Sequence, residues 1–191
     1  MPLPIRSSKM TVEEFFSFTG EENVELIDGV LYDMASPSRI HQAIVRELSG
    51  LINGYIRGNG GDCVLYPAPF AVQLSDSEDT VVEPDISVIC DRNKLNDRGC
   101  LGAPDWIIEV ASPTSISHDY IKKLQLYSKT GVKEYWIVNP SDTSVTVYSF
   151  SESSIPHSYG FDDIVPSGIY KDFGVDFRQI KEVLAKEKLI L

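Results

Sequence analysis

Two apolar segments near the middle of the chain, VVEPDISVIC (81–90) and DWIIEVAS (105–112), most constrain its fold. Both contain many β-branched residues, and the sequence around them is polar or turn-forming, as is typical of strands. The second segment is apolar enough to be a central strand, which needs cover on both faces. The sequence therefore predicts a sheet with helices packed against it.

Helices and hairpins are expected on either side of these two strands. Thr11 and Glu14 form a capping-box pattern that predicts a short helix over about 11–19, and Asp28-Gly29 between two β-prone runs predicts a hairpin. The other expected elements are helices at about 38–57 and 117–130, strands at 63–74, 133–140 and 144–150, and a strand and closing helix within 160–191. The predicted fold class is α/β (α+β): one domain over residues 1–191, with a mixed β-sheet flanked by helices and an N-terminal β-hairpin.

The charge of the chain argues against a broadly basic nucleic-acid-binding surface. Its formal net charge is −11, whereas proteins that hold phosphates usually carry a basic patch. A local basic cleft can still coexist with an acidic outer surface, and a cation-dependent site itself needs carboxylates. The basic residues available for such a cleft are Arg39, Arg46, Arg57, Lys122, Lys129 and Lys133.

The remaining composition predicts a cytoplasmic protein. No apolar run approaches the ~20 residues that span a bilayer, and the first ten residues lack the apolar block of a signal peptide, so no membrane association is expected. Cys63, Cys90 and Cys100 have no CxxC spacing and are expected to be free thiols in a reducing compartment. The three histidines are too far apart in sequence to form a zinc motif.

Glu109 departs from the apolar pattern of its strand. It lies inside the run WIIEVA, where a carboxylate is costly unless it is paired or binds a metal. Side chains alternate between faces along a strand, and Asp85 shares a face of the 81–90 strand with Glu83 and Ser87. Each of the two strands therefore presents one inward carboxylate.

The helix expected at about 117–130 supplies a cation. On a helical wheel Lys123 falls at the border of the apolar side, whereas Lys122 and Lys129 point away from it. Lys123 is therefore the lysine best placed to lean toward the sheet. Asp119 can hold it as an i,i+4 pair.

Two interpretations of this trio stay open on the residues alone. Asp85 and Glu109 can hold Mg²⁺ through carboxylate oxygens, with Lys123 positioning a water or stabilising the developing anion, as in metal-assisted hydrolysis. Alternatively, a strand carboxylate beside a helix lysine is a buried structural salt bridge.

Several spaced motifs resemble the Uma2 family of putative restriction endonucleases, also known as DUF820. The resemblance covers a motif-bearing core over about 11–150. Its pieces are VELIDGVLYDMASPSRIH (24–41), EPDISVI (83–89), WIIEVASPTS (106–115), then Asp119, Lys123 and Tyr127, and finally GVKEYWIVNP (131–140). The presence of several motifs in this order makes the resemblance specific.

The resemblance implies a restriction-endonuclease-like, PD-(D/E)xK nuclease fold. Asp85 and Glu109 would be the catalytic metal ligands, with Mg²⁺ or Mn²⁺ as cofactor. Ala111 stands where this fold usually has its lysine, and the resemblance implies that Lys123 on the following helix replaces it.

The expected function is then a metal-dependent endonuclease that hydrolyses DNA phosphodiester bonds. The alternative is a catalytically inactive nuclease-fold protein with a DNA-binding, regulatory or structural role. A homodimer is expected, because a double-strand cutter commonly needs two sites and two-fold dimers are the commonest oligomers.

Four further residues are candidates for the surroundings of the site. Glu25 is interpreted either as an accessory group near the metal or as a solvated strand carboxylate. His41 is interpreted either as a phosphate or water contact or as a core or capping histidine. Glu47 either points at the site or pairs with a neighbouring cation, and Glu83 is expected at the rim. The serines of ASPTS lack the GxSxG context of a serine nucleophile.

Overall fold

The computed structural model describes residues 9–18, 24–59, 61–74, 78–111, 118–151 and 155–189. Its main feature is a six-stranded sheet in the order β12-β11-β10-β9-β6-β3. In chain order the strands are β3 (Val64–Pro67), β6 (Ile86–Ile89), β9 (Trp106–Val110), β10 (Glu134–Asn139), β11 (Ser144–Ser149) and β12 (His157–Gly160). Only β9 and β10 run parallel within it, so the sheet is mixed, as predicted.

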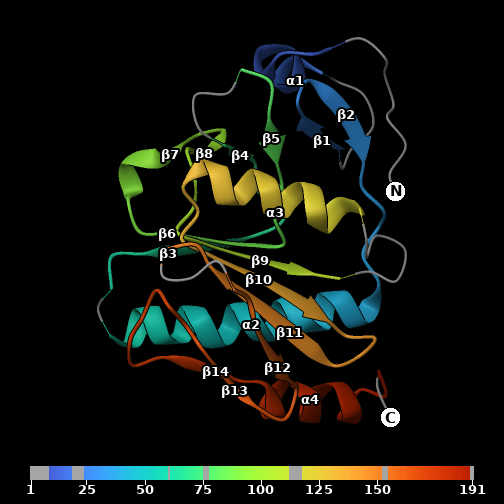
Figure 1. Ribbon diagram of the computed structural model, residues 1–191, viewed down its shortest axis with the longest axis vertical. Coiled ribbons are helices and arrows are strands. Elements are labelled where there is room, and N and C mark those ends of the chain that lie inside the picture. Colours follow the sequence, from blue (N-terminus) through green and yellow to red (C-terminus); the bar gives the residue numbers. More distant parts are fainter. Residues whose placement is uncertain are drawn as a thin grey trace.

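Helices cover both faces of this main sheet (Figure 1). α2 (Arg39–Gly58) and α4 (Phe177–Lys186) lie on one face, and α3 (His118–Thr130) lies on the other. Because side chains alternate along β9, Trp106 and Ile108 pack in the core beneath α2 and α4, whereas Ile107 packs with Tyr127 of α3. Glu109 has the parity of Ile107, so its side chain points toward α3.

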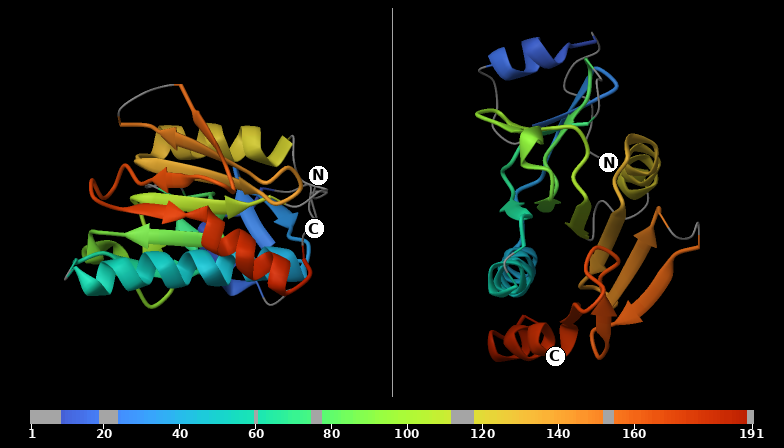
Figure 2. Two further views of the ribbon diagram at one scale, coloured as in Figure 1. Left: turned by 90° about the horizontal axis from the view of Figure 1, so that it is seen from below. Right: turned by 90° about the vertical axis from the view of Figure 1, so that its left-hand side faces the viewer.

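A second six-stranded sheet lies on the α3 side of the main sheet, and the two can be compared from other directions in Figure 2. Its order is β2-β1-β5-β4-β8-β7. The strands are β1 (Val24–Ile27), β2 (Val30–Asp33), β4 (Val72–Gln73), β5 (Val81–Val82), β7 (Leu95–Asn96) and β8 (Gly99–Leu101). The hairpin of β13 (Ile164–Pro166) and β14 (Gly174–Asp176) precedes α4, and a short 3₁₀ helix, η1 (Arg92–Lys94), precedes β7.

Two local predictions at the N-terminal end are confirmed. α1 (Val12–Ser17) begins with the expected capping box, in which the Glu14 N–H donates to Thr11 Oγ1 at 3.3 Å and the Thr11 N–H donates to Glu14 Oε2 at 2.8 Å. β1 and β2 form the expected hairpin. Its two turn residues, Asp28 and Gly29, have φ angles of 52° and 78°, as a two-residue turn with both central residues at positive φ requires.

Two predicted strands are each divided between the two sheets, which corrects the sequence interpretation. The 81–90 segment forms β5 in the second sheet and β6 in the main sheet, and residues 83–85 connect them. Pro84 lies at the break, where a residue without an N–H cannot support a ladder. The 63–74 segment likewise divides into β3 and β4. Asp85 therefore lies where the chain passes from one sheet to the other, not in the middle of a strand.

The expectation of three free thiols is also wrong. Cys63 and Cys90 form a disulfide between β3 and β6, and Cys100 is the free cysteine. The ladder brings the pair together, because Val64 is the partner of Ile89 and the next pair outward is Cys63 with Cys90. Within the described ranges, no helix combines the length and apolar composition that a membrane span requires.

Candidate active site

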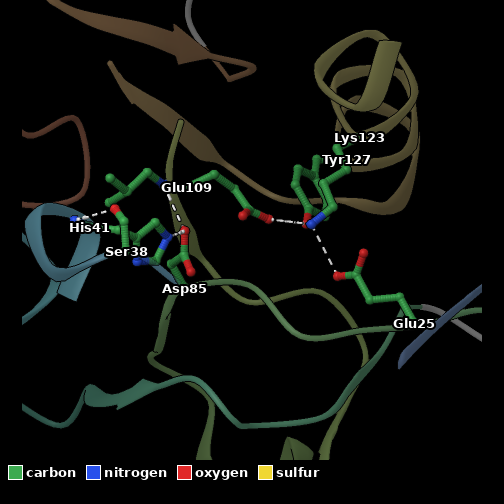
Figure 3. Close-up of polar contacts among 8 residues, drawn as sticks. Glu25, Ser38, His41, Asp85, Glu109, Lys123 and Tyr127 are labelled. Carbon is green, nitrogen blue, oxygen red and sulfur yellow. Dashed lines mark hydrogen bonds and ion pairs between the residues drawn. The ribbon is translucent and has the colours of Figure 1, made fainter. Parts of the chain in front are cut away.

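Asp85 is fixed by contacts with a strand of the main sheet and with the first turn of α2. Its Oδ2 atom accepts a hydrogen bond of 2.7 Å from the backbone N–H of Val110, at the end of β9. The same oxygen lies 3.0 Å from Nε2 of His41, which is in the first turn of α2 (Figure 3). The backbone carbonyl of Asp85 also accepts from the N–H of Ala68, just beyond β3. This carboxylate is therefore held in one place although it lies outside a strand.

Glu109 is held from the α3 side. It is only 8% exposed, and its Oε1 atom accepts a hydrogen bond of 2.9 Å from Lys123 Nζ and one of 3.0 Å from the Tyr127 hydroxyl. Lys123 and Tyr127 are four residues apart, so both project from the same face of α3. The helix therefore presents a cation and a neutral donor to one buried carboxylate oxygen.

Lys123 joins Glu109 to a residue of the second sheet. Its Nζ atom lies 3.0 Å from Oε1 of Glu25, a buried residue of β1. The same Glu25 oxygen accepts from the backbone N–H of Glu83 at 2.9 Å. Lys123 therefore lies between two carboxylates that come from different sheets, as Figure 3 shows. The interpretation of Glu25 as a solvated strand carboxylate is wrong, because the residue is 5% exposed.

His41 lies against Asp85, with Nε2 of its imidazole 3.0 Å from Oδ2. Burial by itself lowers the pKa of the imidazole, but the hydrogen bond and charge of Asp85 outweigh it, so that the pKa is raised above its usual value. Its Nδ1 atom is buried and has no hydrogen-bond partner among the described residues. The side chain of Ser38, the N-cap of α2, accepts from the His41 N–H and so fixes the start of this helix turn.

The site contains more carboxylates than basic side chains: Glu25, Asp85 and Glu109 lie near Lys123 and His41. Burial raises the pKa of Glu109 to about 7; Lys123 opposes this shift, and the charges of Asp85 and Glu25 add to it. For Lys123, burial favours the neutral amine, but Glu109 and Glu25 outweigh it and hold the pKa well above its usual range. Burial is the largest cause of the Glu109 shift, and a further cation near this carboxyl would favour its charged form.

The donor set fits a small divalent cation. Asp85 and Glu109 use one oxygen each for the contacts above, and the other two oxygens, Asp85 Oδ1 and Glu109 Oε2, accept no hydrogen bond from the described residues. The described residues contain no ready cluster of three metal-binding side chains. Mg²⁺ commonly takes one or two carboxylates and keeps several waters, so two carboxylates suffice for it.

The other predicted residues contact neither Asp85 nor Glu109 in the part of the chain that the structure describes. Glu47 forms an ion pair with Arg46, which agrees with the interpretation that it pairs with a neighbouring cation. Glu83 is near the site through its backbone contact with Glu25, and burial, with the charge of Glu25, raises the pKa of its carboxyl. The side chain of Asp119 and the serines of ASPTS lie outside the described residues.

Four of the six predicted basic residues contact groups other than Asp85 and Glu109. Arg39 and Arg46 both pair with Glu187, which follows α4. Lys133 pairs with Asp105, at the other end of β9. Lys122 is the basic residue beside Lys123, and its Nζ donates to the hydroxyl of Tyr32 at 3.0 Å and lies 4.9 Å from the ring centroid.

Tyr127 has a contact that the sequence reasoning did not assign. Its aromatic ring is fully buried and packs against Tyr135. The hydroxyl, however, donates to Glu109. The spacing to Lys123 carried this information, because residues i and i+4 share a helix face.

The sequence of this chain matches a known protein family over most of its length. Residues 12–167 match the family model of Uma2, which is described as "putative restriction endonuclease". The chain belongs to the Uma2 family. A relative in Synechocystis, the uncharacterized protein slr1290, is 27% identical over 143 residues, which make up 73% of this chain and 74% of that protein.

A solved structure confirms the predicted fold class. The crystal structure of a putative nuclease of the DUF820 group from Anabaena variabilis matches with a TM-score of 0.75 at 22% sequence identity. The match covers 92% of this chain and 99% of that one. This Uma2 protein therefore has a mixed sheet flanked by helices in the arrangement of a nuclease-like fold.

Proposed function

We propose that this Uma2 protein is a metal-dependent endonuclease that hydrolyses DNA phosphodiester bonds. The observation that carries the proposal is the arrangement of two firmly held carboxylates beside a buried lysine. Asp85 and Glu109 each keep one oxygen without a donor among the described residues, and Lys123 lies 2.9 Å from Glu109. A purely structural salt bridge does not need the second carboxylate, and it does not leave the charges unbalanced.

In this proposal Asp85 and Glu109 hold one Mg²⁺ or Mn²⁺ ion through these two oxygens. The ion would supply charge stabilisation at a phosphoryl oxygen and would make a water more acidic. The Lys123 ammonium, with three donors and two carboxylate partners, has the capacity to hold the attacking water or the developing negative charge.

The neighbouring residues would act by positioning. Val110 and His41 fix the direction of the Asp85 carboxylate, and Tyr127 fixes that of Glu109. Glu25 would keep Lys123 charged and near Glu109. A homodimer, in which each copy cuts one strand of a duplex, belongs to the same proposal.

The second candidate function is a nuclease-fold DNA-binding or regulatory protein without turnover. The observation that favours a regulatory or structural role over DNA cleavage is the state of the basic residues, because Arg39, Arg46 and Lys133 are each paired with a carboxylate and the net charge is −11. Such a protein has few free cations for a phosphate backbone.

A cleavage assay separates the two candidates. Purified protein is incubated with supercoiled plasmid and with circular single-stranded DNA, in Mg²⁺, in Mn²⁺ and in a chelator. We expect cleavage that requires the metal and falls by about 10²-fold or more in Lys123→Gln and Asp85→Asn. Lys171→Gln, on an exposed lysine, and Asp172→Asn, on an exposed aspartate, serve as matched controls that keep full activity. If no DNA is cut, or if the site variants cut as fast as the controls, the nuclease proposal is wrong.

A further inference from the structure

A cavity of about 300 Å³ lies at the end of the main sheet opposite the Asp85–Glu109 pair. β6 and β9 run antiparallel, so Asp85 at the start of β6 lies near the end of β9, whereas Cys90 just beyond β6 lies near the start of β9. The residues that line the cavity include Cys63, Cys90, Asp105, Lys133, Glu134 and Tyr170. Its volume is at the lower end of the range of small-molecule pockets.

The disulfide forms part of the cavity wall. Cys63 and Cys90 are half-buried, and both line the cavity. Cys100 is different. It is 3% exposed, belongs to the hydrophobic cluster on the α3 face, and burial raises its thiol pKa to about 11. One cysteine pair is thus open to a reagent, and the third cysteine is an internal reference.

A cation lies beside this disulfide. The backbone N–H of Cys90 donates to Asp105 Oδ2 at 2.7 Å, and Oδ1 of the same carboxylate lies 2.6 Å from Lys133 Nζ. Lys133 is 59% exposed, so it remains available to an anion entering the cavity. The thiolate is both the attacking and the leaving form in exchange; Lys133 favours it, and the carboxylate of Asp105, which accepts from the Cys90 N–H, opposes it.

The other polar groups of the cavity are compatible with a bound molecule. Glu134 is committed to the fold, because its carboxylate accepts from the N–H of Gly168 and from the indole N–H of Trp136. The hydroxyl of Tyr170 is buried and has no hydrogen-bond partner among the described residues.

We propose that this cavity is a thiol-exchange site, in which a small anionic thiol reacts with the Cys63–Cys90 disulfide. The thiolate of the reagent attacks one sulfur and forms a mixed disulfide with it, while the other cysteine leaves as a thiolate and takes up a proton. A second molecule of thiol then attacks the mixed disulfide, releases the oxidised reagent and leaves the second cysteine as a thiol. Two thiols are oxidised and one protein disulfide is reduced, so electrons and protons balance.

The exchange would act on the same pair of strands that carries Asp85. β3 is an edge strand, and it is tied to β6 by the disulfide at one end and by the Ala68 N–H to the Asp85 carbonyl at the other. Reduction removes the covalent tie. We expect faster amide hydrogen exchange in β3, with β9 and β10 in the centre of the sheet unchanged.

The test uses the folded, full-length protein purified without reductant. It is treated with reduced glutathione or with neutral 2-mercaptoethanol, alkylated, and mapped by peptide mass spectrometry. We expect Cys63 and Cys90 to become labelled together while Cys100 stays unlabelled until denaturant is added. Labelling of all three cysteines at one rate, or reduction only in denaturant, would mean that exchange requires unfolding and would overturn the proposal. Isolation of the protein with both cysteines as free thiols under air would overturn it as well.

Two sets of variants test the role of the cavity itself. Lys133→Gln should slow reduction by glutathione several-fold more than reduction by 2-mercaptoethanol, whereas Lys129→Gln should change neither rate. Equal slowing for both thiols would show that the cavity does not select an anionic reagent. Cys90→Ser and Cys63→Ser, each treated with oxidised glutathione, should form a stable mixed disulfide on the other cysteine of the pair. Absence of the adduct in both folded variants would show that neither sulfur is reachable. None of these residues belongs to the proposed catalytic site, so DNA cleavage can be measured separately.

Discussion

Lys123 Nζ lies 2.9 Å from Glu109 Oε1, although one residue projects from α3 and the other from the central strand β9. A second carboxylate, that of Glu25, lies 3.0 Å from the same nitrogen. Three carboxyl groups, those of Glu109, Glu25 and Asp85, therefore share one lysine and the imidazole of His41. Burial raises the pKa of Glu109 to about 7, the charges of Asp85 and Glu25 add to this shift, and Lys123 opposes it.

The stability of the metal-free protein should fall as the pH rises from 5 to 8. Glu109 has a folded pKa above its unfolded value, so the folded state binds more protons in this window and loses stability as the pH rises through about 7. The raised pKa of His41 acts in the same direction. Lys123 titrates only at much higher pH and contributes no slope here.

Urea denaturation at several pH values measures this slope. Glu109→Gln should flatten most of it, and His41→Gln should remove a smaller part, since an amide does not titrate. Asp172→Asn, on an exposed aspartate, should leave the slope unchanged. A Glu109→Gln variant with the wild-type slope would contradict the assigned protonation of Glu109.

Mg²⁺ or Mn²⁺ should stabilise the folded protein, because a cation neutralises the excess negative charge of the site. At a concentration of 100 times the dissociation constant, the expected gain in unfolding free energy is about 2.7 kcal/mol. The effect should weaken below pH 7, where Glu109 takes up a proton. Thermal denaturation with and without the ion measures it, and titration calorimetry gives the affinity. Asp85→Asn and Glu109→Gln should abolish the gain and Asp172→Asn should keep it; equal stabilisation of all three variants would place the ion elsewhere.

Much of the local structure and the identity of the lysine could be predicted from the sequence. The capping box of Thr11 and the turn at Asp28-Gly29 depend on neighbouring residues only, so short patterns suffice. The direction of Lys123 follows from the period of one helix. For the same reason the helical wheel separated Lys123 from Lys122, which contacts Tyr32 in place of Glu109.

The parts that were not predicted depend on how distant segments meet. Alternation along 81–90 gives the two faces of an unbroken strand, but it does not show that Pro84 divides the segment between two sheets. The Cys63–Cys90 pair depends on the register of β3 with β6, which joins residues 27 apart and has no local signature. Glu25 could be placed beside Lys123 only once the second sheet was positioned over α3.

Removing the Tyr127 hydroxyl should slow DNA cleavage while the protein stays folded. Tyr127→Phe deletes one of two donors to Glu109 Oε1, and loss of a hydrogen bond to a buried acceptor costs about 1–3 kcal/mol. Lys123 still holds the Glu109 carboxylate, so we expect the fold to persist. The direction of that carboxylate becomes less fixed. The predicted signature is a lower kcat with little change in KM, and a higher concentration of Mn²⁺ for half-maximal activity. Tyr148→Phe, at a half-buried tyrosine whose ring stacks on those of Tyr135 and Phe150, is the matched control. Equal effects of the two substitutions would remove the positioning role of Tyr127.

Reduction of the disulfide should lower the free energy of unfolding by about 3.5 kcal/mol, because the cross-link closes a loop between residues 27 apart and so restricts the unfolded chain. Urea denaturation with and without dithiothreitol measures the difference. The double variant Cys63→Ser/Cys90→Ser should have nearly the stability of the reduced wild-type protein and should not respond to dithiothreitol. This comparison separates the cross-link from any effect of the reductant on Cys100. If the wild-type protein and the double variant respond equally to dithiothreitol, the cross-link does not contribute to stability. The β3 edge must then be held by its ladder to β6 and by the Ala68 contact with Asp85 alone.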